Sequence, residues 1–262
     1  MGELSRTGAL VEELRREIAA HGDAERAIGQ QRYLKSAMPC LGVRLPVLRR
    51  VTRQVLVRHR LAERTDWLAL VQELWDGATH REERYAAIAV LRLPHYRLWA
   101  TDPSLLPLLR HLVMTGAWWD LVDELAAHCV GGILRAHPVQ VTPVIRAWAG
   151  EEDLWVRRTA ILSQLTFKGH TDVVLLADAI EQSLGDPDFF ARKAIGWALR
   201  AYAATDAHWV RDFVKHHADR LSRLSVREAL KHLGDEADEA SMGPDELTVS
   251  PPESSERPPG SD

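Results

Sequence analysis

Four stretches of the sequence decide the fold, because each places a basic residue before small and apolar residues: RYAAIAVL at 84–91, RTAILSQL at 158–165, KAIGWAL at 193–199 and REALKHL at 227–233. Their starts are 74, 35 and 34 residues apart, and the first gap has room for another copy near residue 121, inside WWDLVDELAAHCVGGIL. A period of about 34–40 residues with two helices per repeat is typical of HEAT-like α-solenoids. The repeat therefore predicts a solenoid domain over residues 1–234.

Residues 1–234 show apolar residues at helical spacing almost throughout. One stripe contains Leu10, Leu14 and Ile18, and another contains Val71 and Leu74. No segment alternates like a strand, so the chain is predicted to be all-α, with roughly eleven or twelve helices. Helix boundaries are expected at Pro46, Pro94, Pro103, Pro138 and Pro187, and N-caps at Thr65, Ser104, Thr171 and Ser225.

The repeats also predict a shape and a charged face. A helix pair cannot bury its own apolar face, so neighbouring pairs stack into a curved array. The repeated bases Arg84, Arg158, Lys193 and Arg227 would then form a row along a concave basic face. The alternative is that these bases are solvated ends of amphipathic helices, and periodicity alone does not separate the two.

Charge is unevenly distributed along the chain. The net charge is -4, but residues 235–262 contain nine acids and one base, so they carry -8 and residues 1–234 carry +4. A mildly basic body permits binding to phosphates without requiring it. The last segment, 235–262, is rich in Pro, Ser and Glu and has almost no apolar residue to bury, so we expect a disordered acidic tail.

Several classes of protein are excluded by composition and motifs. No apolar run is long enough to span a membrane, and the N-terminal residues do not resemble a signal peptide. Cys40 and Cys129 cannot build a disulfide framework, so we expect two buried thiols in a cytoplasmic protein. Common nucleotide-binding, hydrolase and zinc motifs do not occur, so neither a cofactor nor a metal is predicted.

The segment WWDLVD at 118–123 contains the strongest candidate for a site. Adjacent side chains on a helix point about 100° apart, so Trp118 and Trp119 cannot both face one core. Trp119 and Asp123 are four residues apart and share a helix face, which places a carboxylate beside an aromatic ring. Such a pair can stabilise a developing positive charge. The alternative is that Asp120 or Asp123 caps or pairs at a helix end while the tryptophans pack.

These motifs resemble those of the AlkD-like DNA alkylation-repair glycosylases, an α-solenoid family of HEAT-like repeats. The resemblance covers about residues 25–234 and depends on WWDxVD, WxRRTAI and KAIGWALR occurring in this order. The residues that carry it are Tyr33-Leu34-Lys35, Leu41-Gly42-Val43, Pro46, Arg84-Tyr85-Ala86-Ala87, Trp118-Trp119-Asp120-x-Val122-Asp123, Trp155-x-Arg157-Arg158-Thr159-Ala160-Ile161, Lys193-Ala194-Ile195-Gly196-Trp197-Ala198-Leu199-Arg200 and Leu224-Ser225-x-Arg227-Glu228-Ala229-Leu230-Lys231-His232-Leu233.

The resemblance implies a role for each matching residue. Asp123 matches the family's catalytic acid, and Trp119 and Trp197 match its two sugar-contacting tryptophans. Arg158 matches an arginine at the active-site face, which we expect to bind a phosphate near the lesion. Tyr33 is similar to a tyrosine that touches the lesion-bearing part of the duplex.

The implied activity is that of a DNA glycosylase in base excision repair. It would hydrolyse the N-glycosidic bond of cationic N3- or N7-alkylated purines in double-stranded DNA, without a metal or cofactor. We expect a monomer whose contacts with DNA include Tyr33, Lys193, Arg200, Arg227 and Lys231. Two alternatives stay open: a non-enzymatic HEAT-like scaffold that binds DNA or protein, and a relative that acts on bulky or crosslinked adducts.

Overall fold

The computed structural model describes residues 6–233, and every regular element within them is helical, which confirms the all-α class. The α-helices are α1 (Arg6–Ala19), α2 (Ala24–Leu34), α3 (Leu45–Arg58), α4 (Arg64–Asp76), α5 (Arg81–Leu91), α6 (Arg97–Ala100), α7 (Leu106–Gly116), α8 (Trp119–Glu124), α9 (Gly131–Ala136), α10 (Pro138–Ala149), α11 (Leu154–Leu162), α12 (Val173–Glu181), α13 (Phe189–Ala203), α14 (Ala207–His216) and α15 (Arg223–Ala229). The tail predicted for residues 235–262 lies outside the described residues.

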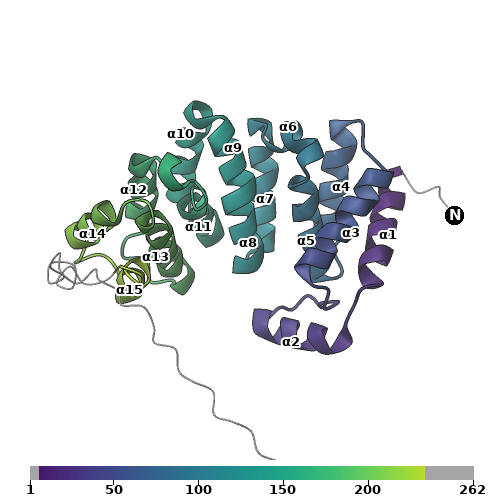
Figure 1. The fold of residues 1–262 in the computed structure, drawn as a ribbon, viewed down its shortest axis with the longest axis horizontal. Helices are drawn as coiled ribbons and strands as arrows, with labels where there is room; N and C mark the ends of the chain where they lie inside the picture. The colour runs from purple at the N-terminus through teal and green to yellow at the C-terminus, as the bar shows by residue number, and fades with distance from the viewer. Residues whose placement is uncertain (1–5, 234–262) are drawn as a thin grey trace, which may run out of the picture.

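Helices follow one another in a row from α1 at one end to α14 and α15 at the other (Figure 1). The repeated sequence pattern falls on α5, α8, α11, α13 and α15, and each of these helices contacts the next. The helices between them pack against this series, as α4 does on α5, α10 on α11 and α14 on α13. The sequence repeat therefore identifies one continuous series of neighbouring helices.

The helical path of the chain continues beyond the last residue of α8. A π-helical turn, Leu125–Val130, joins it directly to α9, so the chain is helical from Trp119 to Ala136. Such π-helical turns are rare in proteins, and many of those that occur lie near functional sites. Short 3-10 helices at Pro94–Tyr96 and Pro103–Leu105 divide the chain between α5 and α7. These interruptions explain why the described chain has more helical segments than the eleven or twelve predicted.

Prolines and aspartates set the helix boundaries. Pro46 and Pro138 lie in the first turns of α3 and α10, where no backbone N–H is needed. The N-caps predicted at Thr65, Ser104, Thr171 and Ser225 are wrong, because Thr65 and Ser225 lie inside helices, Ser104 lies in a 3-10 helix and Thr171 precedes the true cap by one residue. The helices α2, α11, α12, α13 and α14 begin instead at Asp23, Asp153, Asp172, Asp188 and Asp206, whose side chains accept backbone N–H bonds.

Two apolar clusters fill the interior. The larger extends from α1 to α12 and includes Trp67 and Trp75, both fully buried, and the smaller joins α11 to α15. Helices α13 and α15 approach closely at Gly196, where a Cβ atom would lie 2.5 Å from that of Glu228. A side chain at this position would force the two helices apart. This close approach brings the acid of α15 next to the basic side chains of α13.

The structure also bears on the cysteines, on membrane-spanning helices and on clusters of metal-binding residues. Cys40 and Cys129 are both free and buried, as expected, and burial raises their thiol pKa values to about 11 and about 12. None of the helices within residues 6–233 is long and apolar enough to cross a membrane. In the same range no cluster of three or more His, Cys, Asp or Glu residues is arranged to hold a metal ion.

Candidate functional site

A sharp turn before α8 sets the direction of the WWDLVD segment. Ala117 ends α7 in the left-handed conformation at φ 37°, which costs energy for a residue with a Cβ atom. Trp118 is extended and precedes the first helical residue, and its ring packs against Trp155 and Phe190 at centroid distances of 6.0 and 5.3 Å. Trp119 points elsewhere. The two rings therefore have different aromatic partners, although both also pack against the larger apolar cluster.

The other face of α8 lines an open pocket of about 360 Å³. Side chains from α2, α8, α11 and α13 form it: Tyr33, Trp119, Asp123, Arg158, Phe189, Phe190, Lys193 and Trp197. The structure thus brings together all four predicted catalytic residues and two of the predicted DNA-binding residues. Arg200, Arg227 and Lys231 do not line it.

Asp123 and Arg158 form a bidentate ion pair inside this pocket. The Nε and Nη2 atoms of Arg158 donate to the two carboxylate oxygens at 2.7 and 2.9 Å. Its Nη1 atom donates to the backbone oxygen of Phe190 at 2.6 Å. The Arg158 side chain is 3% exposed and that of Asp123 12%. The phosphate contact expected for Arg158 does not agree with this arrangement, because each of its three guanidinium nitrogens already has a protein partner and almost none of the side chain reaches solvent.

Two opposing effects set the protonation of Asp123. Burial raises the pKa of its carboxyl group, because a charged carboxylate is poorly solvated there. The hydrogen bonds and positive charge of Arg158 act in the opposite direction and favour the anion. Burial is the larger effect, so the pKa of Asp123 stays above its usual value. The arginine holds the carboxylate in a fixed orientation and offsets part of the cost of keeping it charged in a buried site.

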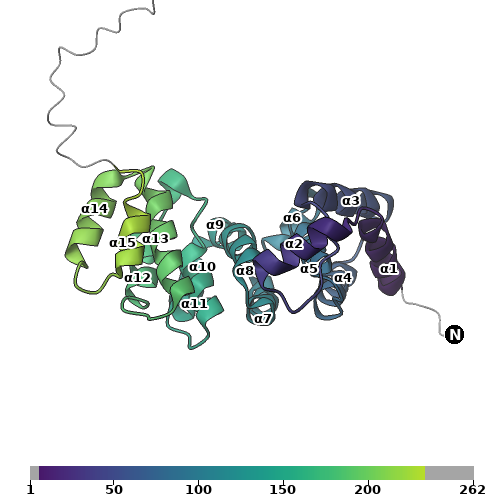
Figure 2. The ribbon, with the colours of Figure 1, turned by 90° about the horizontal axis from the view of Figure 1, so that it is seen from below.

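Aromatic rings form the walls of the pocket. The rings of Trp119 and Tyr33 meet edge to face with centroids 5.9 Å apart, although Tyr33 is 74% exposed. Helix α2, which carries Tyr33, lies off the row of helices with one end beside α8 (Figures 1 and 2). Sequence reasoning missed Phe189 and Phe190, which begin α13 directly after its cap. The sequence feature that could have indicated them is the adjacent aromatic pair about one helical turn before Lys193.

The basic side chains predicted to bind DNA have different surroundings. Lys193 donates to Glu228 at 2.6 Å, and Arg200 donates to the other oxygen of the same carboxylate. These partners, Lys193 first, lower the pKa of Glu228 to about 2. Arg227 and Lys231 are exposed, and no residue within 6–233 pairs with either. The sequence analysis missed Glu228, which lies next to Arg227 in the repeat.

The predicted row of repeated cations is wrong for its first two members. Arg84 is half-buried, lies 5.1 Å above the Trp75 ring and donates to the backbone oxygen of Thr115. Burial lowers its pKa. Arg158 is buried against Asp123, so neither side chain is a solvated helix end or an exposed cation. The later positions are more open to solvent, since Arg227 is exposed and the Lys193 side chain is 38% exposed.

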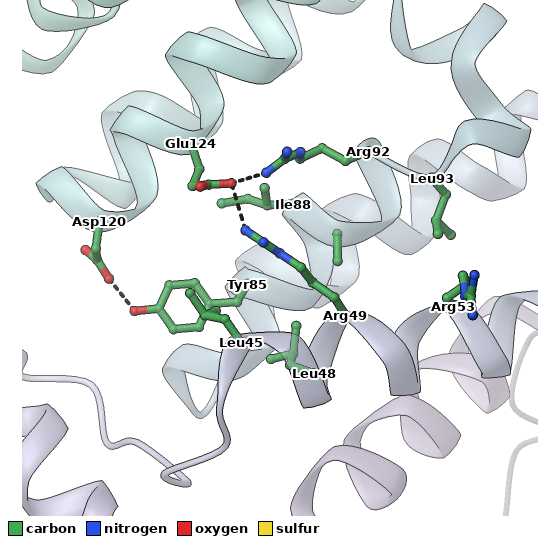
Figure 3. A pocket seen from close by; sticks show the side chains of 11 residues that line it. Leu45, Leu48, Arg49, Arg53, Tyr85, Ile88, Arg92, Leu93, Asp120 and Glu124 are labelled. Atoms are coloured by element: carbon green, nitrogen blue, oxygen red, sulfur yellow. Dashed lines mark hydrogen bonds and ion pairs between the residues drawn. The ribbon is translucent and has the colours of Figure 1, made fainter. Parts of the chain in front are cut away.

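Asp120 faces away from the pocket. Its carboxylate accepts hydrogen bonds from Arg81 on α5. It also accepts one from the hydroxyl group of Tyr85 on the same helix (Figure 3). This ion pair is as buried as that of Asp123, with side chains 6% and 9% exposed. The two acids of WWDLVD therefore both have arginine partners but line different pockets. Asp123 shares its pocket with two indole rings, whereas Asp120 lies beside the single ring of Tyr85 in a second pocket.

A buried carboxylate between indole rings, with a lysine at the edge, is suited to hold a positively charged or sugar-like group.

The family described as DNA alkylation repair enzyme matches residues 14–233. Among solved structures, a predicted DNA alkylation repair enzyme from Enterococcus faecalis is 29% identical, with a TM-score of 0.72, and the match covers 82% of this chain and 97% of that one. No curated protein matches. The chain belongs to the DNA alkylation repair enzyme family.

Proposed function

We propose that the protein is a DNA glycosylase that removes cationic N3- or N7-alkylated purines from double-stranded DNA. The observation that carries this proposal is the carboxylate of Asp123, which is held by Arg158 in a pocket walled by Trp119 and Trp197. An alkylated purine is a good leaving group because it already carries a positive charge. The protein then needs only to stabilise the charge that develops on the sugar.

The reaction breaks the bond between C1′ of deoxyribose and the base nitrogen. The bonding electrons go to the base, which leaves neutral, and the sugar becomes an oxocarbenium-like cation. The indoles of Trp119 and Trp197 attract that cation through their faces. The carboxylate of Asp123 stabilises the charge and orients a water molecule. The oxygen of this water forms the new bond to C1′, and one of its protons passes to bulk water, which leaves a hydroxyl group on the sugar.

Arg158 acts in this scheme as a positioning residue. It fixes both oxygens of Asp123 and keeps the carboxylate charged. Phosphate contacts are assigned to more exposed cations, namely Lys193 at the pocket edge together with Arg200, Arg227 and Lys231. The proposal includes a curved HEAT-like solenoid with a concave basic face around the duplex. The series of contacting helices from α5 to α15 supports this arrangement.

The direct test is release of a free base. The full chain is incubated with duplex DNA containing N7-methylguanine, and free N7-methylguanine is measured by chromatography. We expect release that depends on the protein and leaves an abasic site in the strand. Binding to the duplex without any release of base would contradict the proposal.

A second candidate is a DNA-binding scaffold without enzymatic activity. The ion pair of Asp123 with Arg158 favours it, because a carboxylate with both oxygens occupied has the bonding of a structural residue. A scaffold, however, has no need for open space lined by Trp119, Trp197 and Tyr33 beside that pair. Binding of damaged and undamaged duplex with equal affinity, without base release, is the outcome that this candidate predicts.

The aromatic walls give a graded prediction. We expect Trp119→Ala and Trp197→Ala each to slow base release by about 2- to 30-fold, because a cation–π contact contributes roughly 0.5–2 kcal/mol. Phenylalanine at either position should restore part of the rate, since a ring face remains. Trp209→Ala is the control, because Trp209 stacks on Phe213 and lies outside the pocket. Single-turnover release is the measurement, and unchanged rates in both pocket variants would make these rings packing residues.

A further inference from the structure

A second pocket lies on the other side of α8, between α3 and α5 (Figure 3). Its volume is about 270 Å³. Apolar side chains from α3 and α5, including Leu45, Leu48 and Ile88, form much of its lining, and Arg49, Arg53 and Arg92 extend into it. None of these arginines belongs to the site described above. Two acids, Asp120 and Glu124, also line the pocket, but each is already paired with arginine. An apolar surface with several guanidinium groups beyond those that balance its acids suits an anionic ligand.

This pocket continues along α3. A neighbouring cavity of about 300 Å³ shares Arg53 and Leu93 with it and is also lined by Arg60. Arg49 and Arg53 lie one helical turn apart on α3, about 6 Å along its axis at 1.5 Å per residue. Arg60 lies two residues beyond the end of α3, and its guanidinium group contacts the ring of His95. One DNA strand carries a phosphate for every 3.4 Å of helix axis. Arg49 and Arg53 are therefore spaced to reach two nearby phosphates of one strand.

We call Arg49, Arg53, Arg60 and Arg92 the arginine groove. Its centre already binds one anion, the carboxylate of Glu124. Arg49 donates to this carboxylate at 3.1 Å, and Arg92 donates to the same oxygen (Figure 3). Two guanidinium groups from different helices thus converge on a single oxyanion. Guanidinium groups bind phosphate oxygens with the same donor geometry as carboxylate oxygens.

The ion pairs of Glu124 are easy to exchange. The side chains of Arg49, Arg92 and Glu124 are 49%, 31% and 33% exposed, and ion pairs with this exposure contribute little to stability. Arg53 is exposed and has no partner among residues 6–233. Arg60 contacts the His95 ring. Of the four arginines, Arg53 is therefore without a partner among residues 6–233, and a stronger anion can take Arg49 and Arg92 from Glu124.

We propose that the arginine groove is a second binding site for the DNA backbone, and that Glu124 occupies it as an internal competitor in the free protein. The proposal rests on duplex DNA being the substrate, as argued above. Glu124 follows Asp123 directly in α8, so the helix that carries the carboxylate of the first pocket also carries the competitor of the second. Phosphate oxygens replace the Glu124 carboxylate on Arg49 and Arg92 when DNA binds.

The first test removes a cation. Affinity for a short fluorescent duplex without any lesion is measured over a series of salt concentrations. Arg53→Ala should make the slope of log affinity against log salt shallower by about 0.9, the value for one phosphate contact. Arg16→Ala is the matched control, because Arg16 is also exposed and unpaired within 6–233 but lies on α1 and lines neither pocket. It should leave the slope unchanged.

The second test removes the competitor. Glu124→Gln should raise affinity for the same duplex by up to about fivefold, the size expected for release from an exposed ion pair. Glu151→Gln is its control, because the Glu151 side chain is also 33% exposed and pairs with an arginine, Arg110, away from the groove. That control should bind DNA as the unchanged protein does. Thermal unfolding of each variant checks that the fold is intact.

The two proposals fail in different ways. If the unchanged protein releases N7-methylguanine while Arg53→Ala and Arg16→Ala give the same salt slope, the groove is wrong and the enzymatic function stands. If no base is released, but Arg53→Ala makes the salt slope shallower and Glu124→Gln tightens binding, the arginine groove is supported and the glycosylase activity is not. Weaker binding by Glu124→Gln would also overturn the groove, because the carboxylate would then support DNA binding.

Discussion

Asp123→Asn should lower the single-turnover rate of base release by about 10²–10³. The change keeps the shape of the side chain but removes its negative charge from the place where positive charge develops on the sugar. Loss of one well-placed electrostatic group commonly costs about 2.7–4 kcal/mol of transition-state stabilisation. Affinity for duplex DNA should not fall, because the carboxylate makes no favourable contact with phosphate. Release of N7-methylguanine and binding of the same duplex are measured in parallel.

The structure supplies an unusually close control for this variant. Asp123→Asn also leaves the buried Arg158 without a counter-charge, and this alone can destabilise the fold. Asp120→Asn causes the same problem for Arg81, one turn earlier in α8 and with comparable burial. Both variants should therefore lose similar thermal stability, but only Asp123→Asn should lose activity. A large loss of rate in Asp120→Asn, or a normal rate in Asp123→Asn, would show that the assignment of the acid is wrong.

Much of the fold was accessible from the sequence because helical repeats leave a periodic signal. The basic residue before each apolar run marks the helices α5, α11, α13 and α15, and the gap near residue 121 falls on α8, which contacts α5 and α11 in the same series. The exact helix starts were less accessible. Aspartate, serine and threonine all cap helices, and the spacing of apolar residues does not select which of several neighbouring polar residues takes that role.

The site was only partly accessible for a different reason. Trp119 and Asp123 lie on one short helix, so their spacing alone placed them together. The partners of the charged residues come from other helices: Glu228 reaches Lys193 from α15, and Arg158 reaches Asp123 from α11. A cation in a repeat looks the same in sequence whether it is exposed or paired. Arg84 and Arg158 were therefore predicted as surface cations although both pack against neighbouring helices.

The same ambiguity affects the arginine groove. Arg49 and Arg53 lie on α3 and Arg60 lies just beyond its end, and here the sequence shows only an amphipathic helix rich in arginine. Nothing in that pattern shows that Arg92 and Glu124 converge on it from α5 and α8. Tertiary structure decides which of these cations already has a partner and which can bind a ligand. Arg158 is paired with Asp123, whereas Arg53 is exposed and has no partner among residues 6–233.

Arg158→Met should produce the second large effect, a loss of about 3–5 kcal/mol in the free energy of unfolding. The change keeps the aliphatic part of the side chain but leaves the Asp123 carboxylate buried without its cation, which is the costly way to break such a pair. Arg81→Met breaks the equivalent pair with Asp120 and should cost a similar amount. Denaturant unfolding of both variants measures this effect.

Stability alone does not show what Arg158 does for the reaction, so the pH dependence of base release is the more informative measurement. Burial raises the pKa of Asp123 and Arg158 opposes that rise, so removal of the arginine leaves burial and the nearby acids Asp120 and Glu124 to raise it further. Because the anion is the active form, the fall in rate on the acid side should move to higher pH in Arg158→Met and back towards its original position in Arg158→Lys. In Arg81→Met it should not move.

The salt dependence of DNA binding should also stay unchanged in Arg158→Met, whereas a slope shallower by about 0.9 would mean that Arg158 leaves Asp123 and binds a phosphate when DNA is present.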